Sequence, residues 1–198
     1  MRLLDYLKSE AVRRRLICSD VELEPSIVFA LVRDMPYHRA SDRRPETIIN
    51  EWQGTCSGKH YLLKALFAEL GIPSQIMACT TVVPVDPAQI PESHLPLYDS
   101  ANRRFVDIHN YLILDLPDGQ CMIVDATWPL TARASGLPVN EDFILGQDQR
   151  LAAIPLQTWL VPEDQDPQDY KDHLLRKNFT PAELEFREVV IEALSERN

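Results

Sequence analysis

Cys56 stands where a predicted loop becomes a helix, a position that can activate a thiol. The segment 52–59 reads WQGTCSGK, and an apolar helical pattern follows it. Backbone N–H groups at a helix start have no partners within the helix, and the helix dipole adds positive potential there. Both effects stabilise a thiolate and lower the pKa of the thiol. Cys56 is therefore a candidate nucleophile.

A β-hairpin is predicted around the turn Pro117-Asp118-Gly119. Residues 105–116 and 120–127 have the composition of strands. Pro suits the second position of a type I turn, and Gly suits the left-handed residue that follows, which together make a three-residue loop. That loop pairs Leu116 with Gln120, whereas a two-residue loop would turn one strand over relative to the other.

His109 and Asp125 fall on the same face of this predicted hairpin. Counting back from the turn, His109 faces Thr127 and Asp125 faces Tyr111, and opposite residues share a face. The backbones of His109 and Asp125 are then about 7–8 Å apart, as diagonal neighbours. Asp125 would accept a hydrogen bond from one ring nitrogen of His109, which leaves the other nitrogen to act as a base.

Cys56, His109 and Asp125 together supply a nucleophile, a base and an orienting carboxylate. This is the set that acyl transfer through a thioester requires. An imidazolium beside the sulfur lowers the thiol pKa further, and the same histidine later protonates the leaving amine. The backbone N–H of Cys56 and a donor just upstream, either Gln53 or Trp52, are candidates for holding the oxyanion.

Other interpretations of these residues stay open. His60 lies four residues after Cys56 on the same helical face and competes with His109 as the base, although no carboxylate is evident near it. His109 could instead be a core histidine satisfied by Asp125 alone, and Cys56 an inert small hydrophobe. A zinc site would need paired Cys-x-x-Cys elements that the chain lacks, so we expect neither a metal nor a cofactor.

Helices and one further strand must position these residues. Apolar side chains at helical spacing predict a buried helix from Cys56 that ends near Gly71 and Pro73. Similar spacing predicts helices in the first third of the chain, and residues 74–85 are rich in Ile, Val and Thr, as strands are. Thr180 and Glu183 form a capping box that starts a C-terminal helix.

Composition describes an ordinary globular protein. The 198 residues suit a single domain, with a core over about 45–161, an N-terminal helical region over 1–44 and a C-terminal helical region over 162–198. The formal net charge of -10 argues against a nucleic-acid partner, which would need clustered Lys and Arg.

Sequence features also bear on the compartment. The N-terminus meets charge too early for a signal peptide, and no run approaches the ~18 apolar residues of a membrane helix. We therefore expect a cytoplasmic protein without a membrane partner, whose four cysteines stay reduced. Cys18, Cys79 and Cys121 are expected to be packing residues.

Four motifs lie around the three candidate residues. GTCSGK at 54–59 opens the predicted helix, LGIP at 70–73 closes it, His109 lies on a strand, and VDATW at 124–128 follows. In these motifs the chain resembles the transglutaminase-like cysteine enzymes, a superfamily within the papain-like fold. The resemblance covers residues 52–128, under half the chain. Many relatives carry Trp where this chain has Tyr111, and Pro-Ala-Arg where it has Pro-Ser-Gln at 73–75.

The resemblance implies a catalytic triad at Cys56, His109 and Asp125. It also implies an α+β fold in which the catalytic helix packs against an antiparallel sheet, with extra N- and C-terminal helices. Members include protein crosslinkers, peptidases, deglycosylating amidases and inactive relatives. The implied function is cysteine-dependent acyl transfer or amide hydrolysis on a protein, a peptide or a small amide. The alternatives are a catalytically inactive binding or scaffold protein and an arylamine-acetyltransferase-like acyltransferase, which would use the same triad order.

Overall fold

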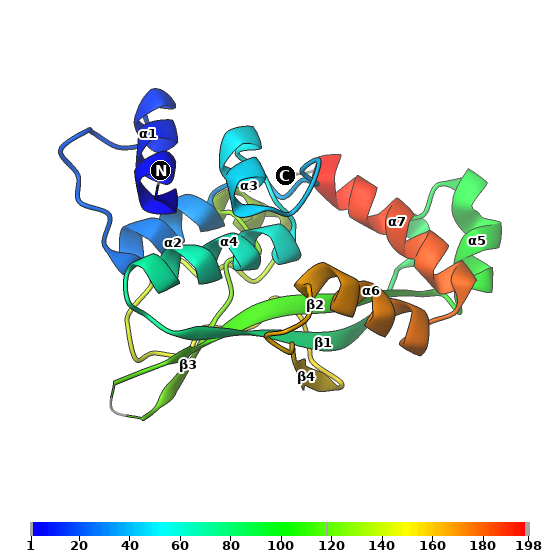
Figure 1. Ribbon diagram of the computed structural model, residues 1–198. Helices are drawn as coiled ribbons and strands as arrows, with labels where there is room; N and C mark the ends of the chain where they lie inside the picture. The colour runs from blue at the N-terminus through cyan, green and yellow to red at the C-terminus, as the bar shows by residue number, and fades with distance from the viewer. Residues whose placement is uncertain (1, 118, 197–198) are drawn as a thin grey trace. The chain divides into compact units, whose positions relative to one another are not determined.

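The computed structural model describes residues 2–117 and 119–196, which form a mixed α+β fold (Figure 1). Four strands form an antiparallel sheet in the order β3-β2-β1-β4. The strands are β1 (Ser74–Pro84), β2 (Arg104–Asp115), β3 (Cys121–Val124) and β4 (Thr158–Leu160). The α+β class expected from the sequence is therefore confirmed.

Helices make up most of the remaining regular structure. The α-helices are α1 (Leu3–Arg13), α2 (Pro25–Arg33), α3 (Pro45–Glu51), α4 (Cys56–Glu69), α5 (Leu95–Ser100), α6 (Pro167–Asn178) and α7 (Pro181–Glu196). The described residues also form the short 3-10 helices η1 (Pro87–Gln89), η2 (Glu92–His94) and η3 (Leu130–Ser135). Among the described residues, none of the helices has the length and apolarity that crossing a membrane requires.

The β2–β3 hairpin has the register that its turn predicts. Leu112 pairs with Val124, and Asp115 pairs with Cys121. The N–H of Leu116 donates to the carbonyl of Gln120 at 2.9 Å. Gly119 has a φ of +82°, a left-handed conformation that glycine adopts without steric cost. Asp118 of this turn lies outside the described residues.

The second strand of the hairpin is shorter than the sequence suggests. We expected it to cover residues 120–127, but β3 ends at Val124, so Asp125 lies just beyond the ladder. Side chains from a later segment accept hydrogen bonds from backbone N–H groups there. Asp148 Oδ1 accepts from the N–H of Ile123 at 2.7 Å, and Gln149 Oε1 accepts from the N–H of Asp125 at 2.9 Å.

The chain divides into two compact units. The first contains the described residues of 1–77 and 110–152, and the second those of 78–109 and 153–197. Cys56 and Asp125 belong to the first unit, and His109 belongs to the second.

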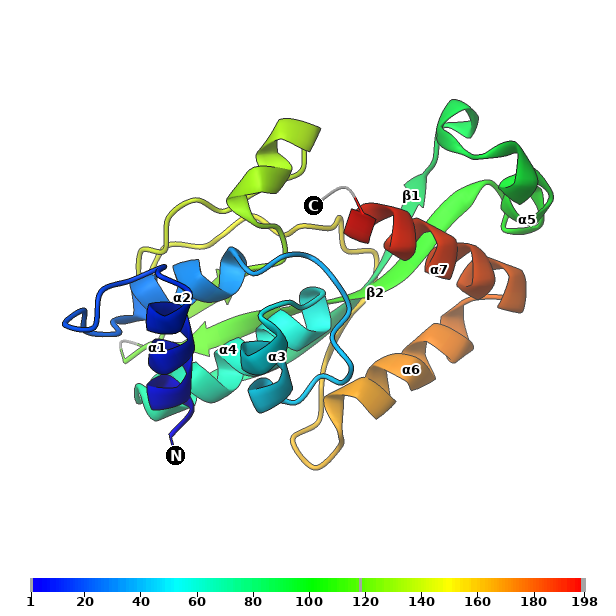
Figure 2. The same cartoon turned by 90° about the horizontal axis from the view of Figure 1, so that it is seen from above.

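α4 is the buried centre of the first unit. It packs against α1, α2 and α3, which gather around it in the view from above (Figure 2). Its four fully buried apolar side chains are Leu62, Leu63, Leu66 and Phe67. The helix ends at Glu69, and Gly71 follows with a φ of +75°. The buried helix predicted after Cys56 is confirmed, with the end that its glycine indicates.

α7, in the second unit, begins with the predicted capping box. The N–H of Thr180 donates to Glu183 Oε2 at 2.8 Å, and the N–H of Glu183 donates back to Thr180 Oγ1 at 3.3 Å. Further along this helix, Phe186 packs against Tyr98 and Ala101 of the same unit. The helix is therefore fixed at its first turn and through an aromatic contact.

Candidate active site

Cys56 is the first residue of α4, as the sequence predicts. Thr55 is the N-cap residue in an extended conformation, and its side chain makes no capping hydrogen bond. The sulfur lies 3.9 Å from Ser57 Oγ, and the residue is only 2% exposed. The position places the thiol at the positive end of the helix dipole.

Two tight contacts fix the chain on either side of Cys56. The N–H of Gly54 donates to the carbonyl of Pro36 at 3.1 Å. In the first turn of α4, a Cβ on Gly58 would lie only 2.7 Å from Cδ1 of Ile48, a buried residue of α3. Only glycine therefore lets α3 approach the first turn of α4 so closely.

The residue after Cys56 is bonded to the residue after His109. Ser57 Oγ donates to Asn110 Oδ1 at 3.0 Å, so α4 contacts β2 within the first unit. Tyr61 also reaches Asn110 Oδ1, and Asn110 Nδ2 donates to the carbonyl of Met77 at 3.2 Å. The Asn110 amide thus joins the helix of the thiol to two neighbouring strands.

His60 does have a carboxylate beside it, contrary to the expectation from the sequence. Its Nε2 lies 3.6 Å from Asp125 Oδ1. However, both ring nitrogens are hydrogen-bonded to backbone groups. The N–H of Ala126 donates to Nε2 at 2.9 Å, and Nδ1 lies 2.7 Å from the carbonyl of Cys56.

These two contacts determine the tautomer of His60. A backbone N–H can only donate, so Nε2 must accept and the proton must be on Nδ1, from which it is donated to the carbonyl of Cys56. A neutral imidazole bound in this way has no ring nitrogen left to remove a proton from a thiol. The geometry therefore supports a structural role for His60.

Asp125 is held by backbone groups from two segments. Its Oδ1 accepts from the N–H of Thr127 at 3.0 Å, and its Oδ2 accepts from the N–H of Ala152 at 2.7 Å. Asn140 Nδ2 donates to its carbonyl at 2.8 Å, and the residue is 2% exposed. A buried carboxyl that accepts a hydrogen bond at each oxygen is suited to carry a negative charge.

Lys59 is a buried lysine that the sequence patterns did not single out. Its Nζ donates to the carbonyl of Arg33 at 2.8 Å and to that of Thr127 at 3.0 Å. Loss of hydration on burial lowers the pKa of Lys59 to about 7, although nearby negative groups, Asp34 foremost, partly oppose this. The side chain connects the end of α2 to the segment that follows Asp125.

His109 lies on β2, where a second carboxylate was also missed. Asp107 stands two residues earlier, and Arg187 of α7 donates to its Oδ1 through Nε at 2.7 Å. Lys171 of α6 lies 3.7 Å from the same oxygen. Burial opposes the charged form, but Arg187, Lys171 and His109 together hold the pKa of Asp107 below its ordinary value. In the sequence these residues are up to 80 positions apart, so no local pattern links them.

The two residues predicted as oxyanion donors have other partners. Gln53 Nε2 donates to the carbonyl of Arg39 at 2.8 Å. The ring of Trp52 lies under the guanidinium of Arg14, 4.9 Å from its centroid, in a cation–π contact. A buried donor without a hydrogen-bond partner among the described residues is instead the indole N–H of Trp128.

Trp128 lies close to the loop of Cys56 through Tyr37. The two rings are in contact, tilted by 37° with 4.4 Å between centroids. Pro36, the residue before Tyr37, accepts from the N–H of Gly54. An unpartnered buried donor is rare and calls for an explanation, such as a ligand group.

Two of the other three cysteines differ from expectation. Cys79 is buried, as predicted, but Cys18 and Cys121 are exposed, so they are not packing residues. Cys121 begins β3, which forms one edge of the sheet. In the part of the chain that the structure describes, no group of three or more His, Cys, Asp or Glu side chains is placed to hold a metal ion.

Comparison of the chain with protein-family models, with curated proteins and with solved structures gave no match.

Proposed function

We propose that this protein is a transglutaminase-like cysteine enzyme that transfers or hydrolyses acyl groups through Cys56, with His109 as base and Asp125 as orienter. The observation that carries the proposal is the place of Cys56, the first residue of the buried helix α4. The hydrogen bond from Ser57 to Asn110 also ties α4 to β2, the strand that carries His109.

Three observations bear on His109, rather than His60, as the base. Both ring nitrogens of His60 are bound to backbone groups, so that histidine is unsuited to proton transfer. The hydrogen bonds from Thr127 and Ala152 hold Asp125 in one orientation, which an orienting carboxylate requires. The confirmed hairpin register also agrees with the turn from which the His109–Asp125 pairing was inferred.

The proposed reaction has two steps. The Cys56 thiolate attacks the acyl carbon of an amide, a C–S bond forms, and the C–N bond breaks as His109 protonates the leaving amine. Water or a second amine then attacks the thioester and gives a proton to His109, and the C–S bond breaks to release the Cys56 thiolate. The N–H of Cys56 and the indole N–H of Trp128 are the candidates for stabilising the oxyanion. The substrate is a protein, a peptide or a small amide.

Selective alkylation tests this proposal. By exposure alone, iodoacetamide should modify Cys18 and Cys121 well before the buried Cys56 and Cys79. An activated thiol reverses that order, so we expect Cys56 to be labelled fastest at neutral pH, as peptide mass spectrometry would show. His109→Ala should slow the labelling of Cys56 about tenfold or more, while the exposed His38→Ala should not. Slow labelling of Cys56 in both the wild type and His109→Ala would contradict the proposal.

A non-catalytic binding protein is the second candidate, and the 2% exposure of Cys56 favours it. In that case Cys56 would react only at the rate at which the chain unfolds. A series of acyl-thioester and amide donors separates the possibilities. An acyl group on Cys56 detected by mass spectrometry supports an enzyme, and transfer from thioester donors alone would indicate acetyltransferase-like chemistry.

A further inference from the structure

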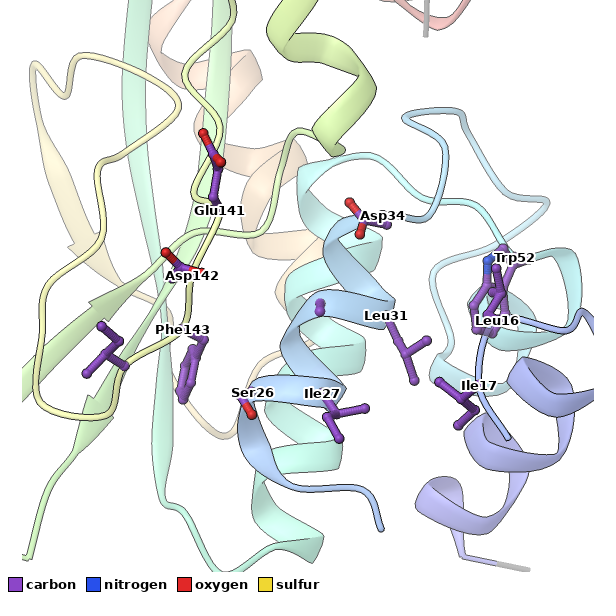
Figure 3. Close-up of a pocket in the computed structure, with 12 residues that line it drawn as sticks. Leu16, Ile17, Ser26, Ile27, Leu31, Asp34, Trp52, Glu141, Asp142 and Phe143 are labelled. Carbon is purple, nitrogen blue, oxygen red and sulfur yellow. The ribbon is translucent and has the colours of Figure 1, made fainter. Parts of the chain in front are cut away.

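A cavity of about 600 Å³ runs along the outward face of α2 (Figure 3). Its floor consists of Ser26, Ile27, Ala30, Leu31 and Asp34, which have the spacing of one helical stripe. We call this cavity the α2 groove. Its volume is in the range of sites that hold an organic ligand or several peptide side chains.

Two walls flank the stripe on opposite sides of α2 (Figure 3). One wall contains Leu16, Ile17 and Trp52, and the other is the segment 141–144. Leu16 is 52% exposed and Ile144 is 58% exposed, so the groove has apolar rims on both sides. Exposed apolar rims around a formed cavity are typical of interaction sites rather than of ordinary surface.

The wall at 141–144 is anchored to the core of the first unit. The ring of Phe143 packs between Phe29 of α2, at 5.3 Å between centroids, and Phe67 of α4, at 5.6 Å. Arg33 Nη1 donates to the carbonyls of Asn140 and Glu141. The groove is therefore formed before any ligand arrives, which reduces the entropy cost of binding.

The charged groups of the groove are all negative. Among the described residues, its lining includes the carboxylates of Asp34, Glu141 and Asp142 and no Lys or Arg. Arg33 contacts Asp34, and Arg133 lies 2.5 Å from Glu141, so these two charges are partly balanced. Within the described residues, the Asp142 carboxylate has neither a hydrogen-bond nor an ion-pair partner. It leaves one unbalanced negative charge between apolar walls.

We infer that the α2 groove docks a polypeptide segment that carries apolar side chains interrupted by Lys or Arg. The apolar side chains would pack on Ile27, Leu31 and Ile144, and a basic side chain would pair with Asp142. The length of the stripe and its two apolar rims match a segment of chain better than a single small amine. This inference does not depend on the chemistry of Cys56.

Fluorescence anisotropy with the full-length protein tests the inference. The probe is a short fluorescein-labelled peptide of alternating leucine and lysine, and the same peptide with glutamate in place of lysine is the negative control. We expect saturable binding of the lysine peptide only. Asp142→Lys should weaken it about tenfold or more, and Ile27→Ser should weaken it at unchanged net charge. Cys56→Ala should bind normally, so failure of this inference is distinguishable from failure of the proposed function.

A matched control removes the effect of overall charge, because a protein of net charge -10 attracts any cationic peptide. Asp164→Lys makes the same charge change at an exposed site outside the groove lining. Equal weakening by Asp164→Lys and Asp142→Lys would overturn the inference. Full competition by leucinamide would also overturn it, because that result would indicate a site for a small amine. A dimer that Asp142→Lys dissociates would overturn it as well, because the occupant would then be a second copy of the chain.

Discussion

The Nε2 atom of His60 accepts a hydrogen bond from the backbone N–H of Ala126 at 2.9 Å. Through its other nitrogen, the same ring reaches the carbonyl of Cys56, one helical turn earlier. The imidazole therefore connects the helix of the candidate nucleophile to the segment of the candidate carboxylate. A histidine four residues after a catalytic-type cysteine resembles a base in the sequence, but this one is a structural link.

His60→Leu should destabilise the protein by about 2–4 kcal/mol, because it leaves the carbonyl of Cys56 and the N–H of Ala126 buried without their partner. Denaturant unfolding measures this change, with the exposed His38→Leu expected to stay within about 0.5 kcal/mol of wild type. Nitrogen NMR of the folded protein should show the proton of His60 on Nδ1. A proton on Nε2 would contradict the structural role.

Lys59→Met should alter how stability depends on pH. The pKa of Lys59 is about 7 in the folded chain and near its ordinary 10.5 in the unfolded chain. Between these values the unfolded state binds more protons, so the lysine makes the free energy of unfolding rise with pH over this window. We expect the wild type to gain about 3–4 kcal/mol relative to Lys59→Met between pH 7 and pH 10.

The control for this measurement is the exposed Lys177→Met, whose difference from wild type should be flat across the same window. Unfolding by urea at a series of pH values gives both curves. A difference between wild type and Lys59→Met that does not change with pH, or that falls as pH rises, would show that Lys59 is not desolvated in the folded chain.

Gly58→Ala should destabilise α4 although alanine favours helices. The new Cβ would lie 2.7 Å from Ile48 Cδ1, and Ile48 is buried and cannot move freely. Overpacking costs about 1–3 kcal/mol, against a gain of about 1 kcal/mol in helix propensity. The double variant Gly58→Ala/Ile48→Val removes the clashing atom and should recover most of the loss. Thermal unfolding of the four proteins tests this, and additive effects would contradict the contact.

The sequence predicted the local parts of the site well. The hairpin register follows from the chemistry of one turn, and the buried face and end of α4 follow from spacing and from Gly71. Both depend on residues that are neighbours in the chain. These are the interactions that sequence patterns describe directly.

Contacts between distant residues were the ones that sequence patterns did not reveal. Gln149 and Ala152 hold Asp125 across more than twenty positions of chain, and they belong to a segment without regular structure. The same long-range contacts end β3 before the predicted strand is complete. The exposure of Cys121 likewise depends on the place of β3 at the edge of the sheet.

Glu183→Gln should lower the free energy of unfolding at neutral pH, and the variant should lose less of that free energy in acid than the wild type does. Burial opposes the charge, but hydrogen bonds from Thr180, Arg104 and Asn102 outweigh it and lower the pKa of Glu183 to about 2. A carboxyl whose pKa falls on folding stabilises the folded state above its unfolded value of about 4.5, and this stabilisation disappears as pH falls towards 2. Because Arg104 is partly exposed, we expect the charge of Glu183 to contribute only about 1–2 kcal/mol of stability.

Wild type and Glu183→Gln should therefore converge in unfolding free energy between pH 4.5 and pH 2, while the exposed Glu163→Gln should follow wild type throughout. Parallel curves for wild type and Glu183→Gln would show that the capping box, rather than the charge, accounts for the effect.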